Sequence, residues 1–137
     1  MRRAFFVRVN RIANLVVRRL GLRRFRGGDL LYLTTTGRKS GKARTTPALY
    51  LLDQGRWIVV ASNGGADWKP GWWLNLQAGS PATVEVDGQR TAVSGVEVDG
   101  AERERLWGEL SKTFDFDAYQ AKVSRRIAIV ALSPVAG

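Results

Sequence analysis

Six short segments of this chain combine apolar and β-branched residues, and most of these segments are separated by turns that contain glycine. Such runs, bounded by turn signals, are typical of β-strands. The predicted strands span residues 30–36, 44–52, 56–62, 82–86, 90–98 and 127–132. Short turns such as Asp53-Gln54-Gly55 join successive segments, so we expect the strands to pair mostly in antiparallel fashion.

Helical signals occur between the strands. Pro70 suits the first turn of a short helix over residues 71–77. The first N–H groups of a helix have no partner within the helix, so proline, which lacks an N–H, loses no hydrogen bond there. Asp99 and Glu102 form a pattern like a capping box at the start of a second helix, over residues 100–113.

A further short helix is predicted to begin at Asp115 or Asp117 and to run to about Arg125. The helices are few and the strands do not alternate with them, which excludes a parallel βαβ architecture. The pattern predicts an α+β domain built on a six-stranded barrel with a curled sheet.

The first 28 residues form a basic amphipathic segment, an N-terminal helix with its linker, and residues 29–137 are expected to form the barrel domain. On a helical wheel, one face of this segment is apolar: Phe5, Phe6, Val9, Ile12, Ala13, Val16, Val17 and Leu20. The opposite face carries Arg8, Arg11, Arg18, Arg19, Asn10 and Asn14. Such a helix either packs on the barrel or a partner subunit, or lies on an anionic membrane surface.

Charge is concentrated in the same segment. The chain has 22 basic and 12 acidic residues, a net charge of +10, and nine of its arginines lie within residues 1–28. The remaining chain is nearly neutral, which disfavours a nucleic-acid-binding face on the barrel. A peripheral contact of the N-terminal segment with the inner face of the cell membrane remains an option.

Cysteine and histidine are both absent from the sequence. Thiolate nucleophiles, disulfides, Cys/His zinc sites and imidazole acid–base catalysis are therefore excluded, and no metal site is predicted. An enzyme with this composition must borrow its reactive centre from a cofactor. The lack of cysteine also fits a cytoplasmic protein.

The turn over residues 37–44 is the strongest candidate for a binding site. It holds two glycines and four cations, and glycine lets backbone N–H groups approach an anion while arginine and lysine bind phosphate or carboxylate oxygens. The spacing between Gly37 and Gly41 is one residue too short for a Walker A loop, and Pro47 follows where a helix would begin. The alternative interpretation is a solvated hairpin tip that keeps a strand edge soluble.

Three segments together resemble the deazaflavin-dependent nitroreductase and quinone reductase family, whose members use reduced coenzyme F-420. They are LLYLTTTGRKSGKARTTPALYL, VVASNGGADWKPGWWLNL and the C-terminal stretch over residues 119–134. The resemblance covers most of residues 30–134. It implies a split β-barrel of the flavin-reductase type.

The resemblance also implies a set of site residues. The phosphate and glutamyl tail of the cofactor are expected at Arg38, Lys39, Ser40, Lys42 and Arg44, and the adjoining strand residues are Thr45, Pro47 and Ala48. Backbone groups of Ala61, Ser62 and Asn63 are expected at the deazaflavin ring, with Trp72, Trp73 and Asn75 closing the site. In relatives a C-terminal aromatic wall meets the substrate, and its counterparts here are Phe114, Phe116 and Tyr119.

The implied reaction is hydride transfer from reduced F-420 to a quinone, enone or nitro compound. The candidates for a hydrogen bond to the acceptor are Ser62, Tyr50 and Tyr119, because negative charge develops on the acceptor oxygen. Two alternatives remain: a split barrel that binds flavin mononucleotide, and a non-catalytic module that binds anions or nucleic acid. The sequence leaves open whether the protein forms a homodimer.

Overall fold

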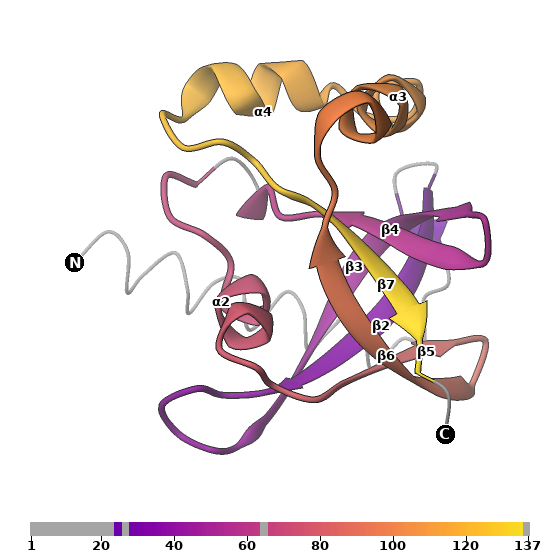
Figure 1. Ribbon diagram of the computed structural model, residues 1–137, viewed down its shortest axis with the longest axis vertical. Helices are drawn as coiled ribbons and strands as arrows, with labels where there is room; N and C mark the ends of the chain where they lie inside the picture. The colour runs from indigo at the N-terminus through magenta and orange to yellow at the C-terminus, as the bar shows by residue number, and fades with distance from the viewer. Residues whose placement is uncertain (1–23, 26–27, 64–65, 136–137) are drawn as a thin grey trace.

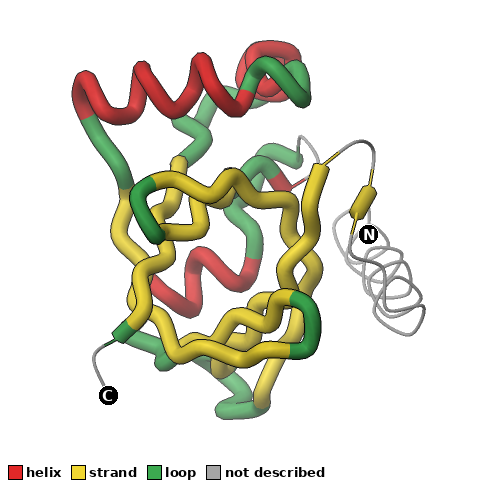
Figure 2. Tube along the Cα trace, turned by 90° about the vertical axis from the view of Figure 1, so that its right-hand side faces the viewer, coloured by secondary structure: helices red, strands yellow, loops and turns green. Residues whose placement is uncertain are grey.

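The predicted strands close into an antiparallel barrel in the computed structural model, which describes residues 24–25, 28–63 and 66–135. The elements are β1 (Arg24–Phe25), β2 (Gly28–Thr36), β3 (Ala43–Asp53), β4 (Arg56–Val60), α2 (Gly71–Gln77), β5 (Ala82–Val86), β6 (Gln89–Glu97), α3 (Gly100–Leu110), α4 (Phe116–Lys122) and β7 (Ile129–Pro134). The neighbours run in the order β2, β3, β4, β7, β6, β5, and β5 pairs back with β2. Figure 2 shows the resulting ring of strands.

The α+β class and the barrel of about six strands are therefore confirmed. All six predicted strands and α2 occur within a few residues of their predicted bounds. The two-residue strand β1 was not predicted; it pairs with the first residues of β2, inside the segment assigned to a linker. The predicted N-terminal helix lies outside the described residues.

Gly28, the first residue of β2, is closely surrounded by side chains. A Cβ atom there would approach the side chain of Leu49 to 2.9 Å and that of Phe114 to 3.1 Å. A larger residue would push these neighbours apart, so close packing favours glycine at the start of β2.

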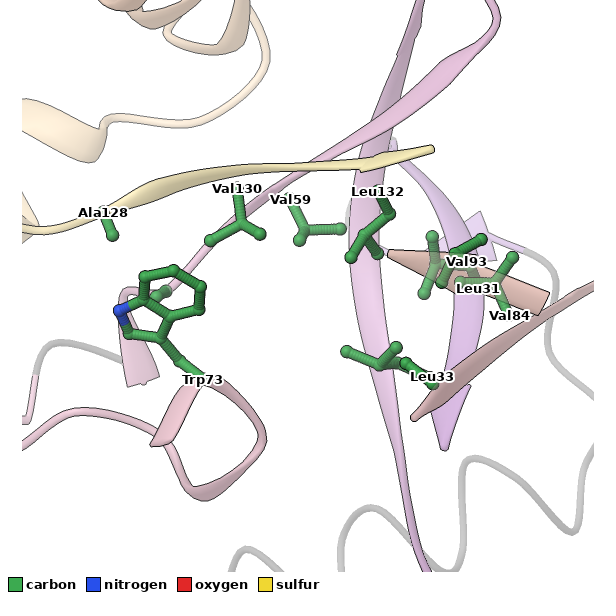
Figure 3. Packing of buried hydrophobic residues seen from close by; sticks show 11 residues of the cluster. Leu31, Leu33, Val59, Trp73, Val84, Val93, Ala128, Val130 and Leu132 are labelled. Carbon is green, nitrogen blue, oxygen red and sulfur yellow. The ribbon is translucent and has the colours of Figure 1, made fainter. Parts of the chain in front are cut away.

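The hydrophobic core consists of two clusters on opposite faces of β7. Val130 and Leu132 belong to the cluster between the strands and α2, which Figure 3 shows with Trp73 near one end. Ile129 and Ala131 belong to the cluster beneath α3 and α4. Strand β7 is buried on both faces, which is the reason for its continuous apolar run.

Helices α3 and α4 lie together over one side of the barrel (Figure 1), and α3 is anchored there by Leu106 and Leu110. The side chain of Leu106 is 0% exposed, and burial of a leucine stabilises a fold by about 1.5–3 kcal/mol. Residues 111–113, predicted as the end of α3, form a turn instead.

Asp99 is the N-cap residue of α3, as predicted, but its side chain makes no capping hydrogen bond. Its carboxylate accepts a hydrogen bond from Arg126 Nη2 at 2.6 Å instead. At α4, Asp115 is the capping residue, and it accepts a hydrogen bond from the N–H of Ala118 at 3.1 Å. Asp117 instead accepts a hydrogen bond from Trp107 Nε1 at 2.7 Å.

Candidate functional site

The barrel opens between β3 and β4. Strand β3 pairs with β2 over residues 43–50, but it pairs with β4 only over residues 51–53. The edge of β3 that faces away from β2 is therefore not covered by β4 along most of its length. A cavity of about 610 Å³ lies at this opening, lined by residues of β3, of the β2–β3 loop, of the segment that follows β4, and of α2.

Most of the predicted site residues line this one cavity. They are Arg38, Lys39, Ser40, Arg44, Thr45, Pro47, Ala48, Ser62, Asn63, Trp72 and Asn75. They come from three separate stretches of sequence, so the fold brings together what the motifs only placed in order. Whether each of them contacts a ligand stays a prediction.

The β2–β3 loop is a tight, internally bonded turn. The N–H of Gly37 donates to the carbonyl of Lys42, and the N–H of Gly41 donates to the carbonyl of Gly37, both at 2.8 Å. Gly41 has φ +70°, a left-handed conformation that glycine adopts without strain. A Cβ on Gly37 would lie 2.5 Å from Ser40 Oγ, so a larger residue there would force the Ser40 side chain to rotate.

Asn75 fastens this loop to α2 from inside the protein. Its side-chain Nδ2 donates to Thr35 Oγ1 at 3.0 Å, and its Oδ1 accepts from the backbone N–H and from Nη1 of Arg38 at 3.1 and 3.2 Å. Asn75 and Thr35 are 4% and 2% exposed. A second link joins the N–H of Thr36 to Ser80 Oγ at 2.8 Å. The position of the Arg38 side chain therefore depends on a buried amide.

Arg125 holds the opposite wall, which consists of the segment after β4. Its guanidinium donates to the carbonyls of Ala61, Ser62 and Ala66 at 3.0, 3.0 and 3.1 Å. Burial lowers the pKa of this guanidinium, and the charge of Asp67 opposes that shift. The sequence alone gave no sign of this role, because Arg125 is more than 55 positions away from all three partners.

Asn63 shapes the same wall from within. It has φ +51°, a left-handed conformation in which asparagine is enriched among non-glycine residues. Its Nδ2 donates to the carbonyl of Trp68 at 3.1 Å. Both residues line the cavity, and Lys69 beside them adds a further cation that the sequence analysis did not select.

Five predicted residues do not line the cavity: three of the predicted cofactor-binding residues and two of the candidate hydrogen-bond donors. Lys42 is exposed at the loop tip, Ala61 is fully buried, and Trp73 is packed in the core at 5% exposure. Tyr50 packs against the core cluster of the barrel and Tyr119 against the cluster under the helices.

The two tyrosines are therefore poorly placed to act on a ligand in the cavity. Burial raises the pKa of the Tyr50 hydroxyl, and the charges of Asp29 and Asp87 raise it further. Tyr119 stacks obliquely on Phe116, with ring centroids 6.1 Å apart.

Phe116 carries the C-terminal contribution to the cavity. It is the one member of the predicted aromatic wall that lines it, and the ring of Phe114 supports it from 5.9 Å. Leu49, Val60 and Leu74 add aliphatic surface. In the sequence these residues look like ordinary core residues. They line the same cavity only because the barrel closes.

The described residues contain no cluster of acidic side chains that could hold a metal ion. Among the helices in the described ranges, none has the length and apolar character needed to cross a membrane.

Comparison with known proteins identifies the family. A sequence profile of the F420H(2)-dependent quinone reductases matches residues 7–134; F420H(2) denotes reduced coenzyme F-420. The putative F420H(2)-dependent quinone reductase Rv3178 of Mycobacterium tuberculosis is 35% identical over 105 residues, which are 76% of this chain and 88% of that protein. A solved structure described as a domain-swapped dimer has a TM-score of 0.68 at 30% identity, over 76% of this chain and 79% of the other. The solved F420-H2 dependent reductase FDR-A has a TM-score of 0.67 at 30% identity, over 76% and 93%. This chain belongs to the F420H(2)-dependent quinone reductase family.

Proposed function

We propose that this protein is an oxidoreductase that transfers a hydride from reduced coenzyme F-420 to a quinone. The observation that carries the proposal is the polarity of the cavity along β3. Arg44 lies at one end of the lining stretch and Leu49 at the other. Five residues of extended strand span roughly 17 Å, so a long ligand can meet cations at one end and apolar surface at the other.

The cationic end fits the tail of the cofactor. Arg38, Lys39 and Arg44 are exposed at the cavity, and none of the ion pairs seen in the described part of the chain involves them. Their charge is thus available to a phosphate and to glutamyl carboxylates. Several cations match such a polyanion better than they match the single phosphate of flavin mononucleotide.

The apolar end fits a planar ring and a quinone. Leu49, Val60 and Phe116 provide flat or aliphatic surfaces there, and Trp72 adds a further aromatic ring to the cavity lining. When bound, reduced F-420 supplies one hydride and one proton, which together convert a quinone to a quinol. The role of the protein is to orient the cofactor and the quinone against each other, to keep water out, and to hold their polar oxygens at defined places.

Ser62 is the best-placed candidate for a hydrogen bond to a reacting oxygen, because it lines the cavity and the two candidate tyrosines do not. Enones and nitro compounds present an oxygen of the same kind, and we include them as further acceptors. The alternative of a flavin mononucleotide enzyme has weaker support, since the matched relative named above is an F420H(2)-dependent quinone reductase.

Two further properties are part of the proposal. Residues 1–26 bind the surface of an anionic membrane, which would place the cavity close to lipid-soluble quinones. Support for this comes from the nine arginines and the apolar face in the sequence. The protein also forms a dimer, for which the support is the relative described as a domain-swapped dimer.

A direct assay tests the function. Purified protein is mixed with reduced F-420 and a soluble quinone, and the return of the oxidised cofactor's visible absorbance is followed. We expect turnover that requires protein, cofactor and quinone together, and that a chelator leaves unchanged. No turnover with any quinone, enone or nitro acceptor, or tighter binding of flavin mononucleotide than of F-420, would refute the proposal.

A further inference from the structure

Arg125 is not among the predicted site residues, yet it makes three hydrogen bonds to the segment that follows β4. Its two terminal nitrogens reach the carbonyls of Ala61, Ser62 and Ala66. The backbone at Arg125 is itself held, because Gln120 Nε2 donates to the carbonyl of Arg125 at 2.7 Å. Gln120 Oε1 also accepts from the N–H of Ile127 at 2.9 Å. The guanidinium is therefore fixed at its base as well as at its tip.

Two of the three carbonyls that Arg125 binds belong to the peptide groups that lead into residues lining the cavity. The carbonyl of Ala61 shares its peptide with the N–H of Ser62, and the carbonyl of Ser62 shares its peptide with the N–H of Asn63. Both of these residues line the cavity. A cation bound to a carbonyl polarises the peptide, so its N–H becomes a stronger donor.

Within the described ranges, neither of these two N–H groups donates a hydrogen bond to another residue. The N–H of Ala61, directly before them, donates to the carbonyl of Ala128. The N–H of Ala66, three positions after Asn63, donates to the carbonyl of Asn63.

We propose that Arg125 is a positioning residue that fixes and polarises the N–H groups of Ser62 and Asn63 as a donor pair for an oxygen of the deazaflavin ring. The inference rests on the proposed function, because it assumes that the ring binds in this cavity. It adds a residue that does not line the cavity and acts only through the backbone.

The energetics of Arg125 agree with such a role. Burial lowers the pKa of its guanidinium, and its Nε is buried without a hydrogen-bond partner. Keeping this charge costs free energy that an apolar side chain would not cost. The fork of the guanidinium is also specific, since one lysine nitrogen cannot reach three carbonyls with the same geometry.

Two variants and two controls test the proposal. Arg125→Met keeps the apolar stem and removes the fork, and Arg125→Lys keeps the charge. Arg126→Ala is the matched control, because Arg126 is exposed and pairs with Asp99. Arg44→Ala is the control for the other end of the cavity. The probes are F-420 and a deazaflavin that lacks the phosphate and the tail, and the thermal midpoint of each variant is recorded.

The first measurement needs no ligand. Backbone mobility at Ser62 and Asn63, measured by NMR relaxation of their amides, should be greater in Arg125→Met than in the unmodified protein, and unchanged in Arg126→Ala. The core amides of β7 should stay as rigid as before in a folded variant. Equal mobility of Ser62 and Asn63 in the unmodified protein and in Arg125→Met would overturn the positioning role.

The second measurement compares affinities. Arg125→Met should bind the tail-less deazaflavin roughly tenfold more weakly, the equivalent of losing about one hydrogen bond. Arg125→Lys should fall in between. Arg44→Ala should weaken F-420 binding and leave the tail-less compound unaffected. If Arg125→Met does not fold, Arg125→Lys with unchanged affinity for the tail-less compound overturns the inference.

A failure of the proposed function can be told apart from a failure of the role assigned to Arg125. If the unmodified protein neither binds F-420 nor oxidises its reduced form, the proposed function is refuted, and the assignment of Arg125 to the ring falls with it. If the unmodified protein binds and reacts but Arg125→Met behaves like Arg126→Ala, only the role of Arg125 is refuted.

Discussion

Replacement of Asn75 by alanine is the sharpest test of how the cavity is built. The side chain of Asn75 is 4% exposed and takes part in three hydrogen bonds, one to Thr35 and two from Arg38. Alanine removes all three and leaves the hydroxyl of Thr35 without this donor in a site that is 2% exposed. The change also removes the link between α2 and the β2–β3 loop.

The size of the effect follows from these bonds. A hydrogen bond contributes about 0.5–1.5 kcal/mol net, and an unsatisfied buried group costs about 1–3 kcal/mol. One buried partner and one partly buried partner are left unpaired, so Asn75→Ala should lower the free energy of unfolding by about 2–4 kcal/mol. For a domain of this size the thermal midpoint should fall by roughly 6–15 °C.

Urea unfolding followed by tryptophan fluorescence measures this loss, since the chain contains five tryptophans. The matched control is Gln77→Ala on the same helix, because the side chain of Gln77 is exposed and accepts a hydrogen bond of only 3.5 Å from Lys69 Nζ. It should change the free energy of unfolding by no more than about 0.5 kcal/mol.

Asn75→Ala should also weaken F-420 binding below its melting temperature, because Arg38 loses its buried anchor. Asn75→Asp keeps an acceptor for Arg38 and should bind F-420 better than Asn75→Ala does. A stability of Asn75→Ala equal to that of Gln77→Ala would show that the amide does not anchor the loop, and the reasoning would fail.

The remaining predictions concern charge. Lys39→Ala combined with Arg44→Ala should weaken F-420 binding with a nearly unchanged thermal midpoint, because both side chains are exposed; unchanged affinity would make the loop a solubility feature. Binding of F-420 to the unmodified protein should weaken as salt rises, and calorimetry showing no salt dependence would argue against a tail held by cations. Hydrogen bonds from Arg105 and Arg56 hold the pKa of Asp53 below its ordinary value of 3.8. The carboxylate therefore stabilises the fold above pH 3.8 and loses this effect as the pH falls toward the lowered pKa, so Asp53→Asn should be destabilising in neutral solution and nearly neutral in strong acid; a pH-independent difference in urea midpoints would contradict this. Protein that contains residues 1–26 should float with anionic liposomes and a form starting at Gly27 should not; if neither floats, the membrane proposal should be abandoned.

The sequence by itself determined the strands, the turns and the basic loop, because these depend on neighbours along the chain. The apolar and β-branched runs located the strands, and β5 and α2 have the bounds that the pattern predicted. Gly41 has the positive φ that the tight turn between β2 and β3 needs. Local sterics and local periodicity are sufficient for all of these features.

The hydrogen-bond partner of a side chain was decided by the tertiary structure wherever the partner is distant in sequence. Asp99 occupies the N-cap position of α3, but its carboxylate makes no capping hydrogen bond. It accepts a hydrogen bond from Arg126 at 2.6 Å instead. Trp73 lay in a segment predicted to close the site, and packing placed its ring in the core instead.

The cavity itself is a consequence of barrel closure. Phe116 reaches it from α4, and Arg125 supports it from the segment before β7, both more than 45 positions away from the residues after β4. No pattern along the chain predicts that these residues lie at one cavity, because their proximity depends on how the strands are ordered and on where β3 and β4 separate. The sequence therefore determined which groups are present for binding, and the closed sheet decided which of them share one space.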